Sequence, residues 1–293
     1  MKVNNNLLSM LDSMWAISPA AYYEYLPLFA NILTNSAVEG KNSDRELSAY
    51  VNYVVNEYGE KIDPSTQIPQ NSIGVVHLIG PMIKYGNYWF WGANELVAML
   101  DYLDKDPNII GTLLKIDSGG GSVKAVAPFL DFFARKTKPV VSLADTSASA
   151  ALWVQSGTDY SFAENNITAQ FGSVGVMAHL MSFAKYYEDL GIKEYVINST
   201  HSEDKNKSFE LALEGKFDLI RDEHLDPLAL KFQSDLKTNL PKLDLNVKGI
   251  LTGKMFYADD ALKAGFINAI GTEIQAIEKI KELAAVQSFI NNN

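Results

Sequence analysis

Short runs of apolar and β-branched residues recur through the middle of the chain, and stretches with helical spacing separate them. Residues 73–79, 109–116 and 139–143 are mostly apolar runs, which is typical of strands that are buried on both faces. Residues 93–103 and 123–135 place apolar side chains three and four positions apart, which predicts helices. Strands that alternate with helices at this spacing predict βαβ units and an α/β fold with a parallel sheet.

The second half of the chain continues with shorter elements. The pattern predicts a helix at 147–157 and strands at 159–163, 167–169, 174–177 and 194–197. It also predicts helices at 181–190, 214–240 and 273–289, the second of which Pro227 can break. The expected architecture is a sheet flanked by helices, followed by a mainly helical C-terminal part.

Residues 1–70 differ in pattern from the rest of the chain. Up to about residue 40 they predict two short amphipathic helices with breaks near Pro19 and Pro27, and a polar linker follows. We therefore expect a helical N-terminal segment with a linker at 1–70 and a main domain at 71–293. No early stretch has the pattern of a signal peptide or a membrane anchor, which predicts a cytoplasmic protein.

Charge and composition exclude several classes of function. The 293-residue chain has a formal net charge of −10 and no cluster of Lys and Arg, which argues against a nucleic-acid partner. It has no cysteine, so disulfides, thiolate zinc sites and a cysteine nucleophile are excluded. Its four histidines include no pair at metal-ligand spacing, and we expect no metal and no other cofactor.

Three blocks of small residues carry candidate chemistry. The run Ser118-Gly119-Gly120-Gly121 follows a predicted strand, where bare N–H groups can face an anion or form an ordinary tight turn. Ser147 and Ser149 lie at the start of a predicted helix, either as helix caps or as an exposed hydroxyl above the helix dipole. Ser173 lies between two glycines, in a turn or as a polar partner for another side chain.

Together with later segments, these blocks resemble the signal peptide peptidase A family over roughly residues 72–272. The segments, in order, are the glycine-rich strand end, Ala148-Ser149-Ala150-Ala151, Phe171-Gly172-Ser173-Val174-Gly175-Val176, Tyr186-Tyr187-Glu188-Asp189-Leu190-Gly191-Ile192, Leu251-Thr252-Gly253-Lys254-Met255-Phe256 and Ala261-Leu262-Lys263-Ala264-Gly265. The resemblance implies a fold similar to Clp protease and crotonase, a repeated ββα spiral core behind the N-terminal helical appendage. It also implies a serine endopeptidase with a Ser/Lys dyad that hydrolyses polypeptide substrates.

The resemblance assigns roles residue by residue. Ser149 matches the family nucleophile, and Ser147 is the less favoured neighbour. Gly120 and Ala150 match the residues whose N–H groups stabilise the oxyanion. Gly119 stands where the family usually has proline, which loosens the loop without removing the donor.

The lysine base has two candidates. Ser173 matches the family serine that holds the lysine in place, and family spacing from it falls near Glu203, so an insertion of about two residues is needed to bring Lys205 into register. Lys207 is the alternative. A lysine with the ordinary pKa of about 10.4 is protonated at neutral pH, so burial beside the serine must lower that pKa. We expect this polar loop to become ordered against a neighbouring subunit or a bound peptide.

Other functions compete with this interpretation. A Ser-His-Asp triad could use His179, although no acid partner is evident. A crotonase-like acyl-CoA enzyme would use the same N–H groups without an exposed serine, and a non-catalytic assembly protein would need neither.

The resemblance leaves two biological settings open. The missing anchor and the single catalytic domain favour a phage or prophage protease that cuts scaffold or capsid proteins, in the bacterial cytoplasm or within an assembling prohead. The alternative is a cytosolic peptidase that degrades signal peptides or other peptides. In either setting the family implies a homo-oligomeric ring or dome with shared active sites.

Overall fold

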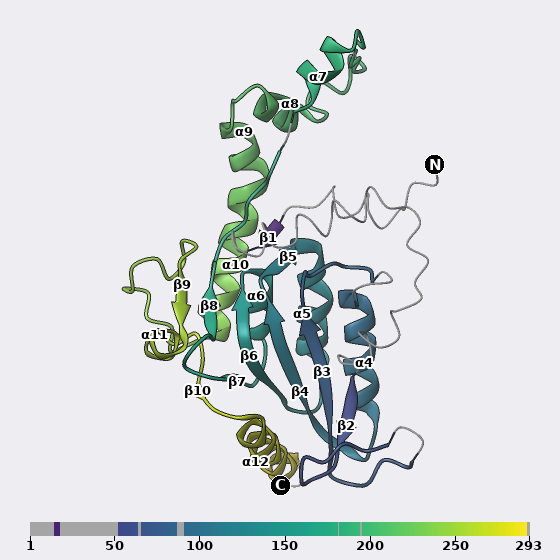
Figure 1. The fold of residues 1–293 in the computed structure, drawn as a ribbon, viewed down its shortest axis with the longest axis vertical. Helices are drawn as coiled ribbons and strands as arrows, with labels where there is room; N and C mark the ends of the chain where they lie inside the picture. Colours follow the sequence, from purple (N-terminus) through teal and green to yellow (C-terminus); the bar gives the residue numbers. More distant parts are fainter. Residues whose placement is uncertain are drawn as a thin grey trace.

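A mixed α/β sheet forms the body of the protein in the computed structural model, which describes residues 15–17, 52–63, 66–86, 91–180, 182–193 and 195–291 (Figure 1). The strands of the main sheet follow the order β10-β7-β6-β4-β3-β2, and β8 pairs with both β6 and β9. Neighbouring strands from β3 to β10 along this path are parallel, and β2 is antiparallel to β3. The α/β fold class predicted from the sequence is confirmed.

The parallel strands are the longest elements of the sheet. The bounds of the strands in the main sheet are β2 Tyr53–Val55, β3 Ser72–Ile79, β4 Ile109–Ser118, β6 Val140–Ala148, β7 Tyr160–Ala163, β8 Gln170–Gly172, β9 Met255–Tyr257 and β10 Ala269–Ile270. Two further strands, β1 (Trp15–Ile17) and β5 (Gly120–Ser122), pair with each other in a separate antiparallel ribbon. This ribbon lies at the end of the sheet where β4 and β6 finish (Figure 1).

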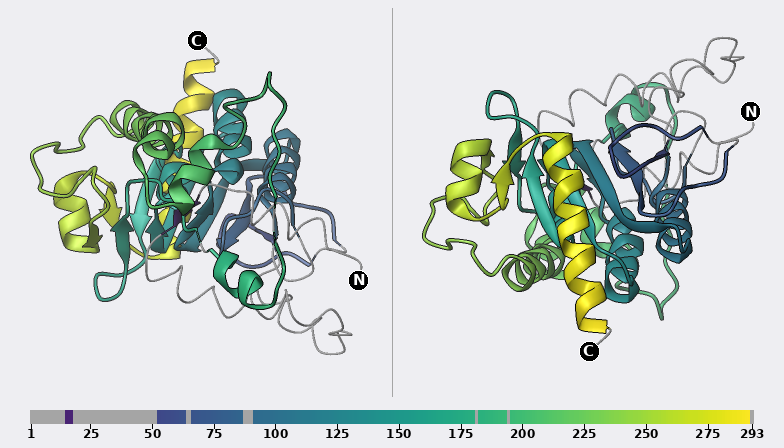
Figure 2. Two further views of the ribbon diagram at one scale, coloured as in Figure 1. Left: turned by 90° about the horizontal axis from the view of Figure 1, so that it is seen from above. Right: turned by 90° about the horizontal axis from the view of Figure 1, so that it is seen from below.

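Helices cover both faces of the sheet and also project from it. One face carries α4 Ala93–Lys105, the 3₁₀ turn η1 Val123–Ala125, α5 Val126–Arg135 and α6 Ala150–Gln155. The opposite face carries α12 Glu273–Asn291, which lies across the strands (Figure 2). The remaining helical elements are α7 Ala184–Asp189, α8 Lys207–Leu213, α9 Asp218–Ile220, the π-helical η2 Arg221–Leu225, α10 Asp226–Asn239 and α11 Ala258–Ala264.

Successive side chains of each strand point to opposite faces of the sheet, and this divides the core into two layers. Side chains such as Leu114 face α4 and α5, where Leu100 and Phe129 are fully buried. Side chains such as Leu113 face α12 and pack with Ile280. Because burial of each large apolar side chain contributes about 1.5–3 kcal/mol, both layers are needed to hold the strands in register.

Most of the predicted core elements are confirmed, and the differences follow from sheet pairing. The helix expected at 147–157 is wrong at its start, because β6 continues to Ala148 and α6 begins at Ala150. Ser147 keeps the extended conformation because it pairs with Ser118 on one side and Phe171 on the other. The strands expected at 167–169, 174–177 and 194–197 are also wrong: β8 occupies 170–172, and no strand is assigned to the described residues of the other two ranges.

The N-terminal predictions are tested only in part. Trp15–Ile17 is a strand and not part of a helix, because these residues pair with β5. The rest of the two helices predicted up to residue 40 lies outside the described residues. The division at residue 70 stays a prediction, and Tyr53–Val55, which precedes it, pairs with β3 in the main sheet.

The predicted break at Pro227 coincides with a change of helix type. Residues Arg221–Leu225 form one π-helical stretch, and Pro227 lies in the first turn of α10, where its missing N–H is not needed. Within the described ranges, no helix combines the length and apolar character that crossing a membrane requires.

Candidate active site

Ser149 occupies a strained turn between β6 and α6. Its φ is +56° and its ψ is −118°, a conformation that few residues other than glycine adopt. Two backbone bonds hold it there: the Ser149 N–H donates to the Gly172 carbonyl at 2.8 Å, and the Trp153 N–H donates to the Ser149 carbonyl at 2.9 Å. A serine on a sharp strand-to-helix turn is the arrangement that presents a nucleophilic hydroxyl in α/β hydrolases.

The neighbouring helix α10 anchors α6 and therefore this turn. The Trp153 ring stacks on Phe232 with centroids 4.5 Å apart, and the Trp153 indole N–H donates to Asp235 at 2.9 Å. Every residue of α6 is buried. Packing around α6 thus holds the strained turn at Ser149 in place.

The two candidate serines differ in what surrounds them. The Ser149 hydroxyl lies 3.5 Å from the Gly175 carbonyl, at the limit of a weak hydrogen bond. The Ser147 hydroxyl is buried inside the sheet, with no hydrogen-bond partner among the described residues. Ser149 follows the last residue of β6, whereas Ser147 is paired by strands on both sides.

The two N–H groups assigned to the oxyanion differ in whether they already donate a hydrogen bond. The Ala150 N–H is the first of α6, and within the described part of the chain no acceptor is found for it. The Gly120 N–H donates to the Ser118 hydroxyl at 3.1 Å, and that hydroxyl donates to the Gly80 carbonyl at 2.6 Å. Gly120 has a φ of +94°, which glycine adopts without strain. Among the described residues the Ala150 N–H is therefore free for an incoming oxygen. The Gly120 N–H can bind the same oxygen only if it shares its hydrogen bond between that oxygen and Ser118 or breaks the bond to Ser118.

Ser173 lies directly beyond β8, beside the turn of Ser149. Its φ is +55°, its N–H donates to the Lys254 carbonyl at 3.1 Å, and the residue is buried. The preceding Gly172 pairs with Ala148 of β6 and has a φ of +140°. A Cβ on Gly172 would lie 2.2 Å from the Lys254 carbonyl oxygen, so only glycine fits between β6 and β9.

The lysine candidates lie on a projecting arm, which we define as residues 182–193 and 195–217. Figure 1 shows α7 and α8 at the far end of this arm, well away from α6 and the ends of β4 and β6. Lys205 is exposed between these two helices, and Lys207, at the start of α8, pairs with Asp204 at 3.1 Å. One chain therefore brings together Ser149, Ala150, Gly120 and Ser173, but neither lysine.

Histidine does not complete a triad among the described residues. No hydrogen bond joins a described histidine to Ser149. His77 lies in β3 on the α12 face of the sheet, and His224 bonds the Ser208 hydroxyl at 3.0 Å in the helical region before α10. No group of three or more acidic or histidine side chains suited to a metal ion is found in the described ranges.

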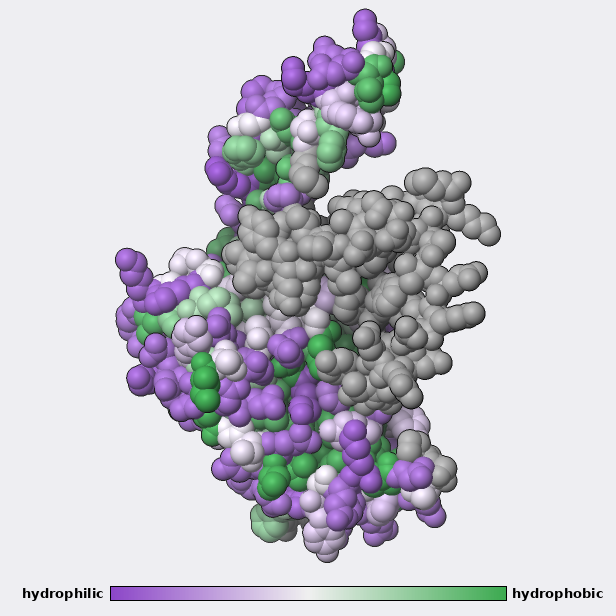
Figure 3. All heavy atoms as spheres, viewed as in Figure 1, coloured by the Kyte–Doolittle hydropathy of each residue, from purple (hydrophilic) through white to green (hydrophobic). Residues whose placement is uncertain are grey.

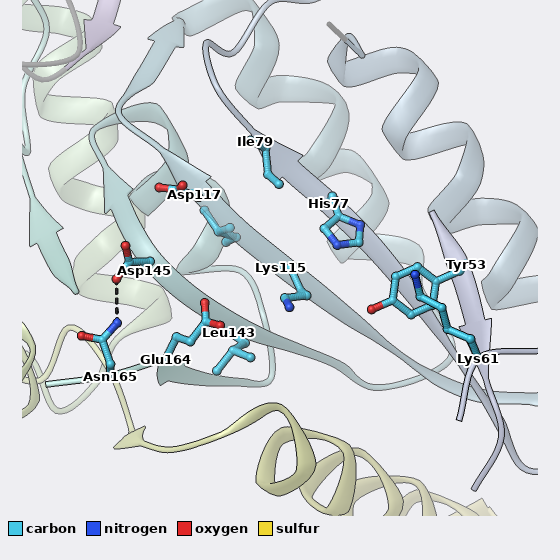
Figure 4. Close-up of a pocket in the computed structure, with 11 residues that line it drawn as sticks. Tyr53, Lys61, His77, Ile79, Lys115, Asp117, Leu143, Asp145, Glu164 and Asn165 are labelled. Carbon is cyan, nitrogen blue, oxygen red and sulfur yellow. Dashed lines mark hydrogen bonds between the residues drawn. The ribbon is translucent and has the colours of Figure 1, made fainter. Parts of the chain in front are cut away.

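A pocket of about 690 Å³, lined mostly by polar side chains, lies on the α12 face of the sheet and includes Asp117 near the end of β4 (Figure 4). Figure 4 shows His77 and Lys115 pointing into it from neighbouring strands, with Asp117 and Asp145 at its other end. Lys115 pairs with Glu273 at 2.8 Å. Burial raises the pKa of Asp117, a hydrogen bond from Thr146 opposes that shift, and the nearby Asp145 adds to it.

Acid is expected to weaken the fold through His77. Burial, reinforced by the positive charge of Lys115, lowers the pKa of His77 from 6.5 to about 4. The unfolded chain therefore binds this proton at a higher pH than the folded chain, so the stability present above about pH 6.5 is lost as the pH falls toward about 4. We expect a loss of about 1–2 kcal/mol between about pH 7 and about pH 5, measured by urea unfolding.

Glutamine provides the matched comparison for this prediction. The His77→Gln variant has no titrating ring and should lose correspondingly less stability over the same pH range. An identical pH dependence in both proteins would show that other groups cause the acid sensitivity.

Three contributors to this region do not follow from the sequence pattern. Two of them are the hydrogen bond from the Gly120 N–H to Ser118 and the contact of the Lys254 carbonyl group with Gly172 and Ser173. The third is the strand β1 beside β5. Its only sequence signal is the short apolar run Trp15-Ala16-Ile17 before Ser18-Pro19, which does not identify a partner.

Comparison of the sequence with known proteins finds similarity to peptidases. Residues 132–287, more than half of the chain, match the model of the family described as peptidase family S49. The chain is 29% identical over 204 residues to a protein of Methanocaldococcus jannaschii that is named as a protease, covering 67% of this chain and 63% of that protein. It is 33% identical over 119 residues to capsid assembly protease C of Escherichia phage lambda, covering 39% of this chain and 27% of that protein.

The chain thus spans less than two thirds of the length of these relatives. Among solved structures, an enoyl-CoA hydratase from Shewanella pealeana aligns over 86% of this chain and 84% of its own. The TM-score of that alignment is 0.43 and the sequence identity is 11%.

Proposed function

The chain belongs to peptidase family S49, and we propose that it is a serine endopeptidase in which Ser149 attacks the substrate carbonyl. The observation that carries this proposal is the strained turn at Ser149, followed directly by the Ala150 N–H, for which the described residues offer no acceptor. Strain at one residue is retained where the surrounding structure over-determines it, which is frequent at catalytic centres.

The chemistry assigns one task to each group around the turn. The Ser149 Oγ forms a bond to the carbonyl carbon while its proton passes to a neutral lysine amine. The N–H groups of Ala150 and Gly120 stabilise the oxyanion, and the lysine then gives the proton to the leaving amine. Water next hydrolyses the acyl-enzyme by the same proton route, which releases Ser149. Ser173 orients the lysine through its hydroxyl.

We propose Lys205 as that base, supplied by a neighbouring copy of the chain. The arm that carries Lys205 exposes many large apolar side chains, and none of the side chains of α7 is buried. Figure 3 displays apolar residues among polar ones on this arm. The exposed apolar residues of the arm include Phe183, Tyr186, Tyr187, Leu190, Ile192, Tyr195, Val196 and Ile197. Such a surface is typical of a protein–protein contact, where lost hydration favours a neutral amine.

We further propose that the substrate is a scaffold or capsid polypeptide of a phage or prophage, cut in the bacterial cytoplasm or within an assembling prohead. The similarity to capsid assembly protease C of phage lambda supports this substrate class. The alternative substrates are signal peptides or other cytosolic peptides.

Labelling with a fluorophosphonate tests the nucleophile directly. This reagent forms a covalent bond to activated serine hydroxyls, and mass spectrometry of the labelled assembly should find one adduct, on Ser149. An adduct on Ser147 would move the nucleophile to that residue. An assembled protein that takes up no label and cleaves no peptide would favour the non-catalytic assembly role.

A further inference from the structure

The strand β5 is held on one side by the body of the protein and on the other by the N-terminal segment of the same chain. Met82 donates its N–H to the Gly120 carbonyl at 3.0 Å, and the Ser122 N–H donates to the Met82 carbonyl at 2.9 Å. On the other side, β1 runs antiparallel to β5, with Trp15 opposite Ser122 and Ile17 opposite Gly120.

Gly121 is the residue of β5 that faces β1. Successive residues of a strand direct their N–H and C=O groups to opposite sides. Since Gly120 and Ser122 bond to Met82, the N–H and C=O of Gly121 point to the other side, where Ala16 lies directly opposite. A Cβ on Gly121 would lie 2.2 Å from the Met82 carbonyl oxygen, so the strand needs glycine here to approach Met82 this closely.

The position of β5 makes its outer edge part of the candidate active site. β5 begins at Gly120, one of the two proposed oxyanion donors, and it packs against α6, whose first residue is the other. An extended peptide paired with this edge would pass beside Ser149 and Ala150. Main-chain pairing of this kind binds peptides to an exposed strand without requiring a fixed sequence.

We propose that the outer edge of β5 binds extended peptides, and that Trp15–Ile17 occupies this edge in cis as a built-in competitor of the substrate. This inference rests on the proposed peptidase function. Ile17 is only 3% exposed, so the occupying strand is seated in the body and does not lie loosely over it. The covalent connection makes this competition intramolecular, so its strength does not depend on the protein concentration.

The short length of β1 makes this occupation reversible. A ribbon of three residues against three is marginal by itself, and Ala16 opposite Gly121 is its single central pair. A longer peptide that extends beyond β5 on both sides can therefore displace it. The apparent affinity for an added peptide equals the affinity of the vacant edge multiplied by the fraction of molecules in which the edge is vacant, so occupation by β1 lowers it.

Proline at position 16 tests the proposal in an otherwise complete chain. Ala16→Pro removes the N–H that faces Gly121, whereas the control Ala16→Ser keeps it. Both changes are made in the Ser149→Ala background, so that the measurement does not depend on catalysis. The probe is a fluorescein-labelled synthetic peptide with the sequence of residues 12–20, Asp-Ser-Met-Trp-Ala-Ile-Ser-Pro-Ala, and its binding is followed by fluorescence anisotropy.

The Ala16→Pro protein should bind the probe about tenfold more tightly than its parent, and the Ala16→Ser protein should bind it as the parent does. Hydrogen exchange should show faster exchange of the Gly121 amide in the proline variant alone. Equal probe affinity in all three proteins, or unchanged exchange at Gly121, overturns the proposal.

The outcome is separable from that of the proposed peptidase function. In the Ser149-containing protein, Ala16→Pro should lower the KM for a cleaved peptide about tenfold and leave kcat unchanged. If none of these proteins cleaves a peptide but the probe and exchange results are as expected, the peptidase proposal fails while the peptide-binding edge stands. Cleavage with an unchanged KM shows that β1 does not compete with the substrate.

Discussion

Ser149→Ala is expected to abolish peptide-bond hydrolysis, with kcat/KM lowered by at least about a thousandfold. Alanine removes the Oγ that would form the acyl-enzyme. It can keep the backbone conformation at φ +56° and the hydrogen bond from the N–H of residue 149 to the Gly172 carbonyl. The loss should therefore be chemical and not structural. Cleavage of a fluorogenic peptide by the assembled protein measures the rate, and thermal unfolding checks that the fold is kept.

Ser147→Ala is the matched control for this experiment. Ser147 lies two residues earlier on the same strand, and its buried hydroxyl has no hydrogen-bond partner among the described residues. Its removal should leave kcat/KM within about threefold of the original, since an unsatisfied buried hydroxyl contributes little to stability. If Ser149→Ala retains full activity and Ser147→Ala loses it, the nucleophile assignment is wrong.

Lys205→Ala is expected to have the second-largest effect, a fall in kcat of about a hundredfold to ten-thousandfold with little change in KM. Removal of the amine leaves Ser149 without a group to accept its proton. Since Lys205 is exposed on the arm of a single chain, its loss should hardly alter the thermal stability of the subunit. Single-turnover kinetics with a peptide substrate separates this chemical effect from an effect on binding.

Lys207→Ala provides the matched control on the same loop. Lys207 is paired with Asp204, whose hydrogen bond raises the pKa of the Lys207 amine. That pairing favours the charged form, which cannot accept a proton, so Lys207→Ala should keep most of the activity. Activity lost with Lys207→Ala and kept with Lys205→Ala would transfer the role of base to Lys207.

Mixing the two inactive variants examines whether a neighbouring subunit supplies the lysine. In a random assembly of Ser149→Ala and Lys205→Ala subunits, about a quarter of the sites would combine an intact serine with an intact lysine from the adjacent copy. Activity should then return on mixing. Continued inactivity of verified mixed assemblies would place both groups in one chain.

Several features of the site could be predicted because they depend on short segments. Ser149, Ala150 and Ser173 each follow a strand, and the ends of neighbouring parallel strands meet at one edge of a sheet. The structure does bring these residues together, through the bond between Ser149 and Gly172. Glycine at position 172 could be expected in a turn, but its need to admit the Lys254 carbonyl could not.

Other features could not be predicted because they depend on residues far apart in the chain. The run Trp15-Ala16-Ile17 has a pattern compatible with a helix, and its extended form is decided by pairing with Gly120–Ser122, about a hundred residues away. The bond from Gly120 to the Ser118 hydroxyl has a similar origin, because that hydroxyl is fixed by the distant Gly80 carbonyl. Local propensity is too weak to outweigh such contacts.

By itself, the sequence determined the α/β class, most elements of the sheet and its helices, and the set of small residues from which a serine site can be built. These follow from hydrophobic periodicity and turn chemistry, which act over a few residues. Only the tertiary structure decided the strained conformation of Ser149, the seating of β1 on β5 and the separation of Lys205 from the serine within one chain. Each of these depends on which distant backbone groups and surfaces meet, and local pattern does not encode that pairing.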